Sequence, residues 1–510
     1  MNKSPHDRRV YYYVVCLAAH IGAVWLLPYV PTQDGPSHLY NLVILKDLFN
    51  GGKEWGDYFT VQLHAVPNLG FHIIAYPLLS IFPPLIVEKI FISCYAVLMG
   101  VSVPLLLRTF ERPILPLSYL VFPVIFNFTL LMGFYSYTIA VPLFILAFAL
   151  SWELRNRSIF LKFICLNVAG VVLFYFHLIP FIFFLMSLVS IVMSESAGYK
   201  RKIQELLKLL IIIIPSLLNL IFYLSKGTKS LFPGASYLFS FSRFMDLLVD
   251  LTCFSTVNYS LWQLFPASLF MFLIVLFGQT AVKDIYKRLK QSRDIRSSEK
   301  TLIYLAAALI AIYLLAPSYV GAGAYFNQRF PWVILLIILP ILRIPDAGFF
   351  KRFGPIVIAG VVAICFAFNA AILWEQNLRV KKFLSGLNAQ LPKGAFVMTY
   401  KPASVLWSRV DVLLHAASYY GLFRGCVYIG DYETSFHYFP VRFKKTLPVF
   451  PSPYEMAYEA ATIDWTIYPS IQYLLGWEVG HTDKDKLQRY FLIVKENGPL
   501  TVWQRKQTVL

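Results

Sequence analysis

Charge is scarce in this chain of 510 residues, because Asp, Glu, Lys and Arg make up 14% of it against about 25% of an ordinary soluble domain. Cysteine is also scarce: the six cysteines form no CxxC pair and no Cys/His spacing typical of a metal site, so they predict neither a metal centre nor a disulfide framework. The sequence contains no P-loop, HExxH or GxSxG motif, and no GxGxxG in a βαβ setting. These absences argue against a soluble globular enzyme and against nucleotide-dependent chemistry.

Hydrophobic residues are abundant instead, at 58% of the chain, and they recur in apolar runs of about 20 residues, the length that crosses a bilayer. The sequence therefore predicts a polytopic membrane protein surrounded by membrane lipids. The formal net charge of +18 comes from short Lys and Arg blocks between the apolar runs, not from a continuous basic stripe. Membrane orientation explains this pattern, and no nucleic-acid partner is expected.

Eleven apolar segments predict membrane spans, beginning near residues 10, 85, 113, 133, 158, 178, 206, 261, 301, 329 and 354. The basic blocks between them should face the cytoplasm. With the first span running outward and Arg108 inside, a single crossing, 85–107, fits between them. The weaker apolar segment 67–83, which carries three prolines and is followed by Pro84, is therefore expected to be an interfacial or re-entrant helix.

This topology places the loop 29–84 and the C-terminal tail on the outer face. The tail has turn signals, mixed charge and short β-rich runs, and its end, 490–504, is typical of a hairpin. The predicted fold is a polytopic α-helical membrane protein with about 11 transmembrane helices and interfacial helices. Its predicted domains are a transmembrane domain, 1–375, and a small extracytoplasmic α/β domain, 376–510.

The densest polar cluster near the membrane is TQDGPSHLYN, residues 32–41. Pro36 followed by an apolar rhythm predicts an amphipathic helix lying along the membrane surface. Asp34 then stands just before a helix N-terminus, where the dipole favours its charge, with Ser37, His38 and Asn41 on the first turns. The alternative is that Asp34 merely caps the helix and that His38 is an interface residue.

A first outer loop with an acid near the bilayer surface, juxtamembrane helices, many spans and an outer C-terminal domain together resemble the GT-C superfamily of membrane glycosyltransferases. The resemblance implies that Asp34 is a general base on the acceptor and that the donor is a sugar linked to a polyprenyl phosphate. Many members have two adjacent acids, whereas Gly35 follows Asp34 here. A second carboxylate, if one takes part, would come from Glu54 or Asp57 in the same loop.

One carboxylate suffices chemically for inverting transfer, because the base takes a proton from the acceptor hydroxyl and the phosphate is already a competent leaving group. A cation near the phosphate would stabilise the developing charge. Arg329, in YFNQRF after Gly321–Gly323, is the predicted phosphate ligand, and a snorkelling anchor is the alternative. The predicted substrate-binding residues are His38, Tyr40, Asn41, Asn68, His72, Tyr137, His177, Gln328 and Arg329; several of these equally fit aromatic-belt or packing roles.

The prediction is therefore a glycosyltransferase of cell-envelope glycan synthesis in the bacterial cytoplasmic membrane, with its active site facing outward. The acceptor class stays open between a lipid, a polysaccharide and a protein. No metal ligands are predicted, and a divalent cation stays an open alternative to a cofactor-free reaction. The alternative function is a polytopic transporter or lipid flippase with an outer accessory domain. Polar clusters at the outer ends of the spans and the lack of an internal repeat favour the enzyme.

Overall fold

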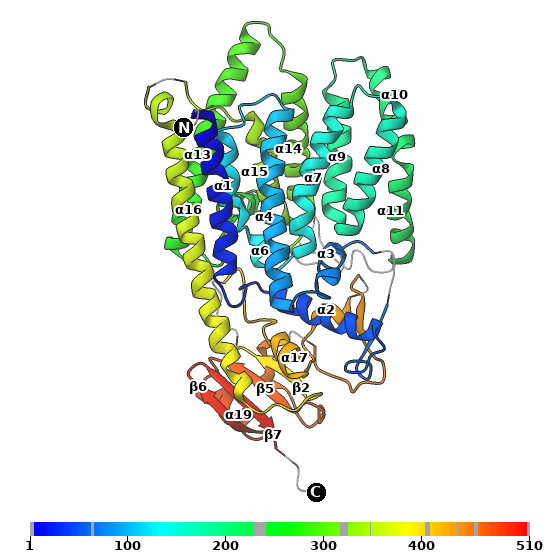
Figure 1. The fold of residues 1–510 in the computed structure, drawn as a ribbon, viewed down its shortest axis with the longest axis vertical. Helices are drawn as coiled ribbons and strands as arrows, with labels where there is room; N and C mark the ends of the chain where they lie inside the picture. Colours follow the sequence, from blue (N-terminus) through cyan, green and yellow to red (C-terminus); the bar gives the residue numbers. More distant parts are fainter. Residues whose placement is uncertain are drawn as a thin grey trace.

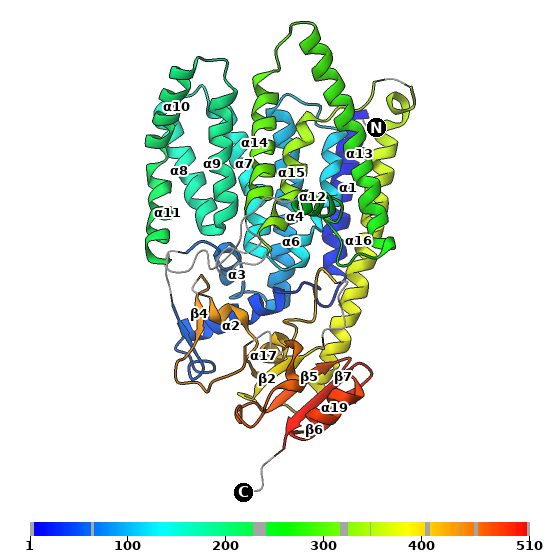
Figure 2. The same cartoon turned by 180° about the vertical axis from the view of Figure 1, so that it is seen from behind.

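The chain forms a long helical bundle with a small β-sheet at one end, and its two termini lie at opposite ends of the molecule (Figure 1). The computed structural model describes residues 5–62, 66–227, 241–316, 325–346, 348–402, 408–436, 438–452 and 457–506. Long apolar helices run side by side along the long axis, as both views show (Figure 2).

The helices of the bundle correspond to the apolar segments predicted from the sequence. They are α1 (Pro5–Trp25), α4 (Pro84–Thr109), α7 (Tyr135–Leu154), α8 (Ile159–Phe176), α9 (Leu178–Ser194), α10 (Tyr199–Ile212), α11 (Ile214–Gly227), α13 (Leu261–Lys290), α14 (Ser297–Leu315), α15 (Pro331–Ile338) and α16 (Gly348–Phe383). The segment predicted to begin near 113 is broken into η1 (Leu117–Val121), α5 (Phe122–Ile125) and α6 (Phe128–Leu131). The short helices η3 (Asn327–Arg329) and η4 (Leu339–Ile341) flank α15.

Six of the described helices are long and apolar enough to cross a membrane, and the bent pair α10 and α11, with 69° between its halves, makes a seventh candidate. The chain is thus an integral membrane protein. Three further apolar stretches are helical but shorter, at Leu117–Leu131, Leu178–Ser194 and Asn327–Ile341. Eleven crossings therefore stay a prediction. The segment 67–83 forms only the nine-residue helix α3 (Gly70–Leu78), which is too short to span a bilayer.

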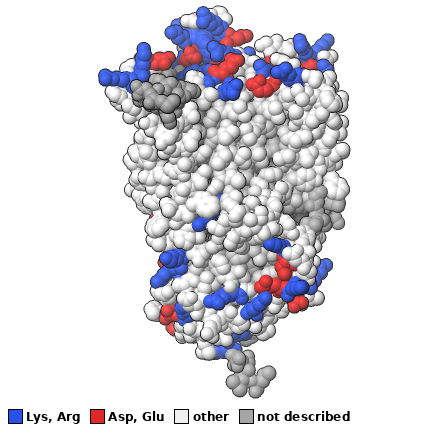
Figure 3. Space-filling model, in the orientation of Figure 1, with Lys and Arg blue, Asp and Glu red and all other residues white. Residues whose placement is uncertain are grey.

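Charged side chains gather in two bands at the ends of the molecule, separated by a broad uncharged belt (Figure 3). At the end away from the sheet, Glu299 is buried among Arg112, Arg288 and Arg343, at N–O distances of 2.7, 3.0 and 2.9 Å. This cluster joins Arg288 in the last turn of α13 with Arg112 and Arg343, which lie outside the helices. The structure thus places at one end several of the blocks that the positive-inside rule assigned to one face.

The first loop folds between the bundle and the tail. Its elements are α2 (Gly35–Phe49), β1 (Phe59–Val61) and α3. Pro36 lies in the first turn of α2, as predicted, since its missing N–H costs nothing there. The helix is not an amphipathic surface helix, however, because every residue from Gly35 to Leu42 is buried. The tail covers the face that periodicity alone assigned to solvent.

The tail carries a mixed five-stranded sheet among the described residues, with strand order β3-β2-β5-β7-β6. The strands are β2 (Phe396–Tyr400), β3 (Val427–Tyr428), β5 (Tyr473–Trp477), β6 (Phe491–Asn497) and β7 (Leu500–Arg505). β2 is parallel to β3 and β5, and β6 with β7 forms the predicted terminal hairpin, turning at Gly498 with φ +60°.

Short elements complete the tail: η5 (Leu384–Asn388), α17 (Ser418–Arg424), η6 (Tyr432–Ser435), β4 (Val441–Phe443), η7 (Ala460–Thr462) and α19 (His481–Leu487). β4 pairs antiparallel with β1 of the first loop, so the tail and the first loop share a second, two-stranded sheet. A further helix, α12 (Phe241–Thr252), precedes α13. Asp250 of this helix pairs at 2.9 Å with Arg409 of the tail, which joins the tail to the bundle.

Candidate active site

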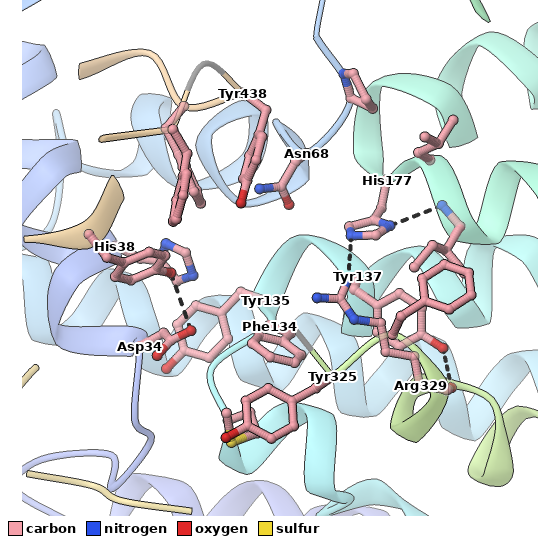
Figure 4. A pocket seen from close by; sticks show the side chains of 18 of the residues that line it. Asp34, His38, Asn68, Phe134, Tyr135, Tyr137, His177, Tyr325, Arg329 and Tyr438 are labelled. Carbon is pink, nitrogen blue, oxygen red and sulfur yellow. Dashed lines mark hydrogen bonds between the residues drawn. The ribbon is translucent and has the colours of Figure 1, made fainter. Parts of the chain in front are cut away.

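A cavity of about 410 Å³ lies where the bundle, the first loop and the tail meet. Figure 4 shows Asp34 and His38 on one side of it and His177 and Arg329 on the other. Its walls come from chain segments hundreds of residues apart, and aromatic rings supply much of them. The lining residues are Gln33, Asp34, His38, Pro67, Asn68, Met132, Phe134, Tyr135, Tyr137, His177, Leu178, Ile179, Tyr223, Leu224, Tyr325, Phe326, Arg329, His415, Tyr432, Phe436, Tyr438 and Phe439.

Asp34 occupies the N-cap position of α2, but its carboxylate makes no capping hydrogen bond. One oxygen accepts a hydrogen bond from the Gln33 amide (3.2 Å) and the other from the Tyr432 hydroxyl (3.2 Å). Nε2 of His415 lies 3.7 Å from the first oxygen. The carboxylate is therefore turned into the cavity, which is not what a helix cap requires.

The Gln33 side chain is held in one orientation. Its carbonyl oxygen accepts the backbone N–H of Asp411 at 3.0 Å, which leaves its NH₂ group to donate to Asp34. The carboxylate of Asp411 in turn pairs with the buried Lys401 at 2.5 Å. The backbone N–H of Asp411, in the tail, thus orients the neutral Gln33 amide toward the Asp34 carboxylate. The Asp411 carboxylate itself pairs with Lys401.

Burial raises the pKa of Asp34 to about 6, although nearby His38 and the hydrogen bonds from Gln33 and Tyr432 act in the opposite direction. The side chain is only 5% exposed. A carboxylate whose pKa lies near neutrality is a stronger base than an exposed aspartate and is still ionised at pH 7. Asp34 is therefore suited to accept a proton from a hydroxyl group.

His38, one turn into α2, faces two hydrogen-bond acceptors. Nδ1 lies 2.7 Å from the Glu433 carboxylate, and Nε2 lies 2.9 Å from the carbonyl oxygen of Gly133. Burial alone lowers the pKa of His38, but Glu433, Asp34 and the Gly133 carbonyl outweigh it and raise the pKa. Since both partners only accept, the ring carries both protons and places a positive charge next to Asp34.

Glycine permits the close approach of two backbones beside Asp34. Gly133 has φ +82°, and a Cβ there would lie 2.7 Å from the Gly35 nitrogen and 2.8 Å from the Asp34 nitrogen. The C-terminal end of α6 meets this stretch through hydrogen bonds from Asp34 N to Met132 O (3.1 Å) and from Gln33 N to Leu131 O (3.0 Å). The position of Asp34 is therefore set by the bundle as well as by its own helix.

The opposite wall is cationic. The Arg329 guanidinium stacks on the rings of Phe134 (4.5 Å) and Tyr137 (5.5 Å), and its Nη1 lies 3.0 Å from Nε2 of His177. The Tyr137 hydroxyl donates to the Arg329 carbonyl. A snorkelling side chain would point its head toward water along the bundle surface, whereas Arg329 points into the cavity (Figure 4).

The structure brings six of the predicted site residues to the cavity: Asp34, His38, Asn68, Tyr137, His177 and Arg329. The remaining four are not among the cavity-lining residues. Tyr40 is buried behind the site and donates to the Cys426 carbonyl (3.1 Å), and Asn41 donates to Asp431 (2.8 Å). His72 is buried in α3, and Gln328 lies in η3.

The two alternative acids of the first loop are also remote from the cavity lining. Glu54 is exposed and pairs with Lys393 at 3.0 Å, and Asp57 is exposed. A different acid, Glu88, lies close to the Asp34 segment. Glu88 of α4 accepts from Tyr135 at 2.5 Å, and a Cβ on Gly35 would lie 2.7 Å from its carboxylate. Gly321–Gly323, predicted to be flexible, falls outside the described residues.

Sequence reasoning missed the contribution of the tail to this site. It assigned no site role to His415, Tyr432 or Glu433. The contact of Tyr432 with Asp34 joins residues 398 positions apart, so no local pattern could have shown it. In the part of the chain that the structure describes, no three His, Cys, Asp or Glu side chains converge where they could hold a metal ion.

Comparison with known proteins supports the fold. Neither a family model nor a curated protein sequence matches the chain. Among solved structures, ArnT from Cupriavidus metallidurans bound to undecaprenyl phosphate is similar with a TM-score of 0.53 and 9% identity, over 99% of both chains. The arabinofuranosyltransferase AftD from Mycobacteria is similar with a TM-score of 0.44 and 10% identity, over 98% of this chain and 40% of AftD. The likeness to ArnT along the whole chain shows that this protein shares the fold of ArnT.

Proposed function

We propose that this protein is an inverting glycosyltransferase that moves a sugar from a polyprenyl-phosphate-linked donor to an acceptor hydroxyl, with Asp34 as the general base. One observation carries the proposal: a buried carboxylate with a pKa of about 6 and an arginine line the same cavity. Inverting transfer from a lipid phosphosugar needs a base for the acceptor and a cation for the leaving phosphate. The GT-C fold, and the undecaprenyl phosphate bound to ArnT, support the choice of donor.

In the proposed reaction the acceptor oxygen attacks the anomeric carbon while its proton passes to Asp34. The bond between that carbon and the phosphate oxygen breaks, and the polyprenyl phosphate leaves with the bonding electrons. Gln33 and Tyr432 orient the carboxylate through their hydrogen bonds. The positive charge on His38 keeps Asp34 ionised before the attack and so matches the resting state of a base.

Arg329 is the proposed ligand of the leaving phosphate, because its planar fork donates two parallel hydrogen bonds to phosphate oxygens. It lies on the wall of the cavity opposite Asp34 (Figure 4). Separation of the base from the phosphate ligand onto opposite walls is what in-line displacement at a carbon between them requires. The apolar side chains Leu178, Ile179 and Leu224 line the same cavity and offer a surface for a lipid chain.

The decisive experiment is turnover of a lipid-linked sugar. Purified protein in detergent, supplied with a panel of polyprenyl-phosphate sugars and candidate lipid and glycan acceptors, should release polyprenyl phosphate and form a product of inverted anomeric configuration, detected by NMR. Asp34→Asn should abolish both. Retained configuration would refute the single-displacement mechanism. Transport of intact lipid across proteoliposomes without bond cleavage would favour the alternative flippase.

The proposed site faces the outside of a bacterial cytoplasmic membrane. In a Cys94→Ser background, which removes the native exposed cysteine, single cysteines at the exposed positions Gln390 and Gln291 report the two ends. An impermeant maleimide should label Gln390→Cys in intact cells and Gln291→Cys only after lysis. The reverse pattern would contradict the outward orientation.

A further inference from the structure

His177 is held between two hydrogen-bond donors. It lies between α8 and α9, and its Nδ1 accepts the backbone N–H of Ile179 at 3.1 Å, which caps α9. Its Nε2 lies 3.0 Å from Nη1 of Arg329. Figure 4 shows both contacts as dashed lines. A guanidinium only donates, and so does a backbone N–H, so the imidazole would need two acceptors to satisfy both.

No protonation state of the ring meets that need. A neutral imidazole has one acceptor nitrogen and one N–H, and an imidazolium has two N–H groups. Since Nδ1 caps the helix, the proton of the neutral ring sits on Nε2 and points at an N–H of Arg329. The ring is buried, so this conflict between two donors is not relieved by bulk water. Among the described residues, the Nε2–H group of His177 therefore faces a donor and not an acceptor.

We infer that His177 is a second phosphate ligand, and that a phosphoryl oxygen of the lipid donor accepts hydrogen bonds from both His177 Nε2–H and Arg329. This inference rests on the proposed function, because it takes the anion from the proposed donor. An oxygen shared by two N–H donors separates their nitrogens to roughly 4.5 Å, so the Arg329 guanidinium moves away from the ring when phosphate binds. The capping bond to Ile179 fixes the tautomer that this role requires.

The surroundings favour a lipid phosphate over free phosphate. Leu178 and Ile179, next to His177 in the chain, and Leu224 of α11 line the same cavity. An isoprenoid chain attached to the phosphate would cover these side chains. Free inorganic phosphate would use only the two N–H donors and would leave the apolar wall unoccupied.

Two amide substitutions test the roles of the two His177 nitrogens separately. An Asn side chain places its amide near the position of Nδ1, so His177→Asn retains a good N-cap and loses the Nε2 donor. A Gln side chain reaches the position of Nε2, so His177→Gln retains a donor toward the phosphate and loses the cap. A purely structural role predicts that Gln is the more harmful change. A phosphate-binding role predicts that Asn is.

The probes are farnesyl phosphate, farnesol and inorganic phosphate, titrated into the purified full-length protein by calorimetry, with thermal unfolding measured in parallel. His177→Asn should weaken farnesyl phosphate binding at least about tenfold, the loss expected for one charge-assisted hydrogen bond, and leave farnesol binding and Tm unchanged. His177→Gln should lower Tm and retain most of the phosphate affinity. Inorganic phosphate binding as tight as that of farnesyl phosphate would overturn the assignment to a lipid.

Equal affinity of wild type and His177→Asn for farnesyl phosphate would overturn the role of His177 and leave the proposed function standing. Absence of farnesyl phosphate binding to the wild type would overturn the donor assignment itself, and with it this inference. If the Asn variant unfolds, the Gln variant still decides, because loss of phosphate affinity in a folded Gln variant contradicts a donor at Nε2.

Discussion

The two walls of the cavity each hold a buried histidine, and the two rings have opposite surroundings. His38 faces a carboxylate and a carbonyl, so both ring nitrogens lie next to acceptors and the surroundings favour the cationic ring. His177 faces a guanidinium and a backbone N–H, so the ring is neutral and has one donor too many. The wall with His38 also carries the Asp34 carboxylate, which can accept a proton, whereas the wall with His177 carries N–H donors suited to an anion. The two walls therefore suit different parts of the substrates: one can accept a proton from a hydroxyl group, and the other can donate hydrogen bonds to a phosphate.

The wall that carries Asp34 and His38 is tested most strongly by the variant Asp34→Asn. The amide keeps the shape and cannot take a proton, so the rate of sugar transfer should fall by about 10²- to 10⁴-fold, the usual scale for loss of a general base. Burial raises the pKa of Asp34 from 3.8 to about 6, so the stability linked to its protonation is present at low pH and is lost as the pH rises between these two values. The variant should therefore be at least as stable as wild type at pH 7.

Turnover and thermal unfolding measured on the same preparation check this prediction. Full activity of Asp34→Asn would remove the base from the mechanism. An unfolded variant would show that the carboxylate itself is needed for folding.

On the opposite wall, Arg329→Ala should weaken binding of farnesyl phosphate by about 1.5 to 3 kcal/mol, the range for a hydrogen bond to a charged group. Arg329→Lys should fall between wild type and Ala, because Lys keeps the charge and loses the fork. Calorimetric titration gives the order directly. A snorkelling anchor would instead leave the affinity equal in all three proteins and lower only expression or Tm.

The coupling within the Asp34 wall can be measured through pH. Because Asp34 acts in its ionised form, kcat/KM of the wild type should fall as the pH drops below about 6, where the carboxylate becomes protonated. His38→Gln removes the neighbouring positive charge and raises the pKa of Asp34, so the acidic limb of the profile should move to higher pH. An unmoved limb would show that His38 does not influence the base.

The smallest effects are expected at the two alternative acids. Glu54→Gln and Asp57→Asn change exposed side chains that do not line the cavity, so each should leave stability within about 0.5 kcal/mol of wild type and the transfer rate essentially unchanged. They also serve as matched controls for Asp34→Asn in the same loop. A large loss of activity in either variant would identify that residue as a second catalytic acid, although neither lines the cavity.

Much of the architecture could be predicted from local patterns. The apolar segments gave the helices, because a helix that satisfies its own backbone is the form in which such a run enters a bilayer. The terminal hairpin followed from two β-rich runs around Gly498. Pro36 marked the start of α2 for the same reason, since proline fits the first turn of a helix.

Patterns failed where distant segments cover one another. The apolar rhythm of α2 predicted a surface helix, yet the tail buries its polar face as well, including Asn41 beside Asp431. Tyr432 and His415 reach Asp34 from the tail, although a lone His in a tail domain carries no sign of such a contact. The predicted ligands Tyr40 and Asn41 share the helix of Asp34 but turn toward the tail.

The sequence by itself determined that this chain is a membrane protein and at which residues its helices begin. It also determined that Asp34 and Arg329 stand at the ends of apolar segments. These are consequences of hydrophobicity and short-range geometry, which depend on neighbouring residues. Only the tertiary structure decided that Asp34 is buried enough to shift its pKa, that His38 is a cation and that His177 faces Arg329. Burial and hydrogen-bond partners come from residues up to about 400 positions away, and the physical reason is that desolvation and charge act through space and not along the chain.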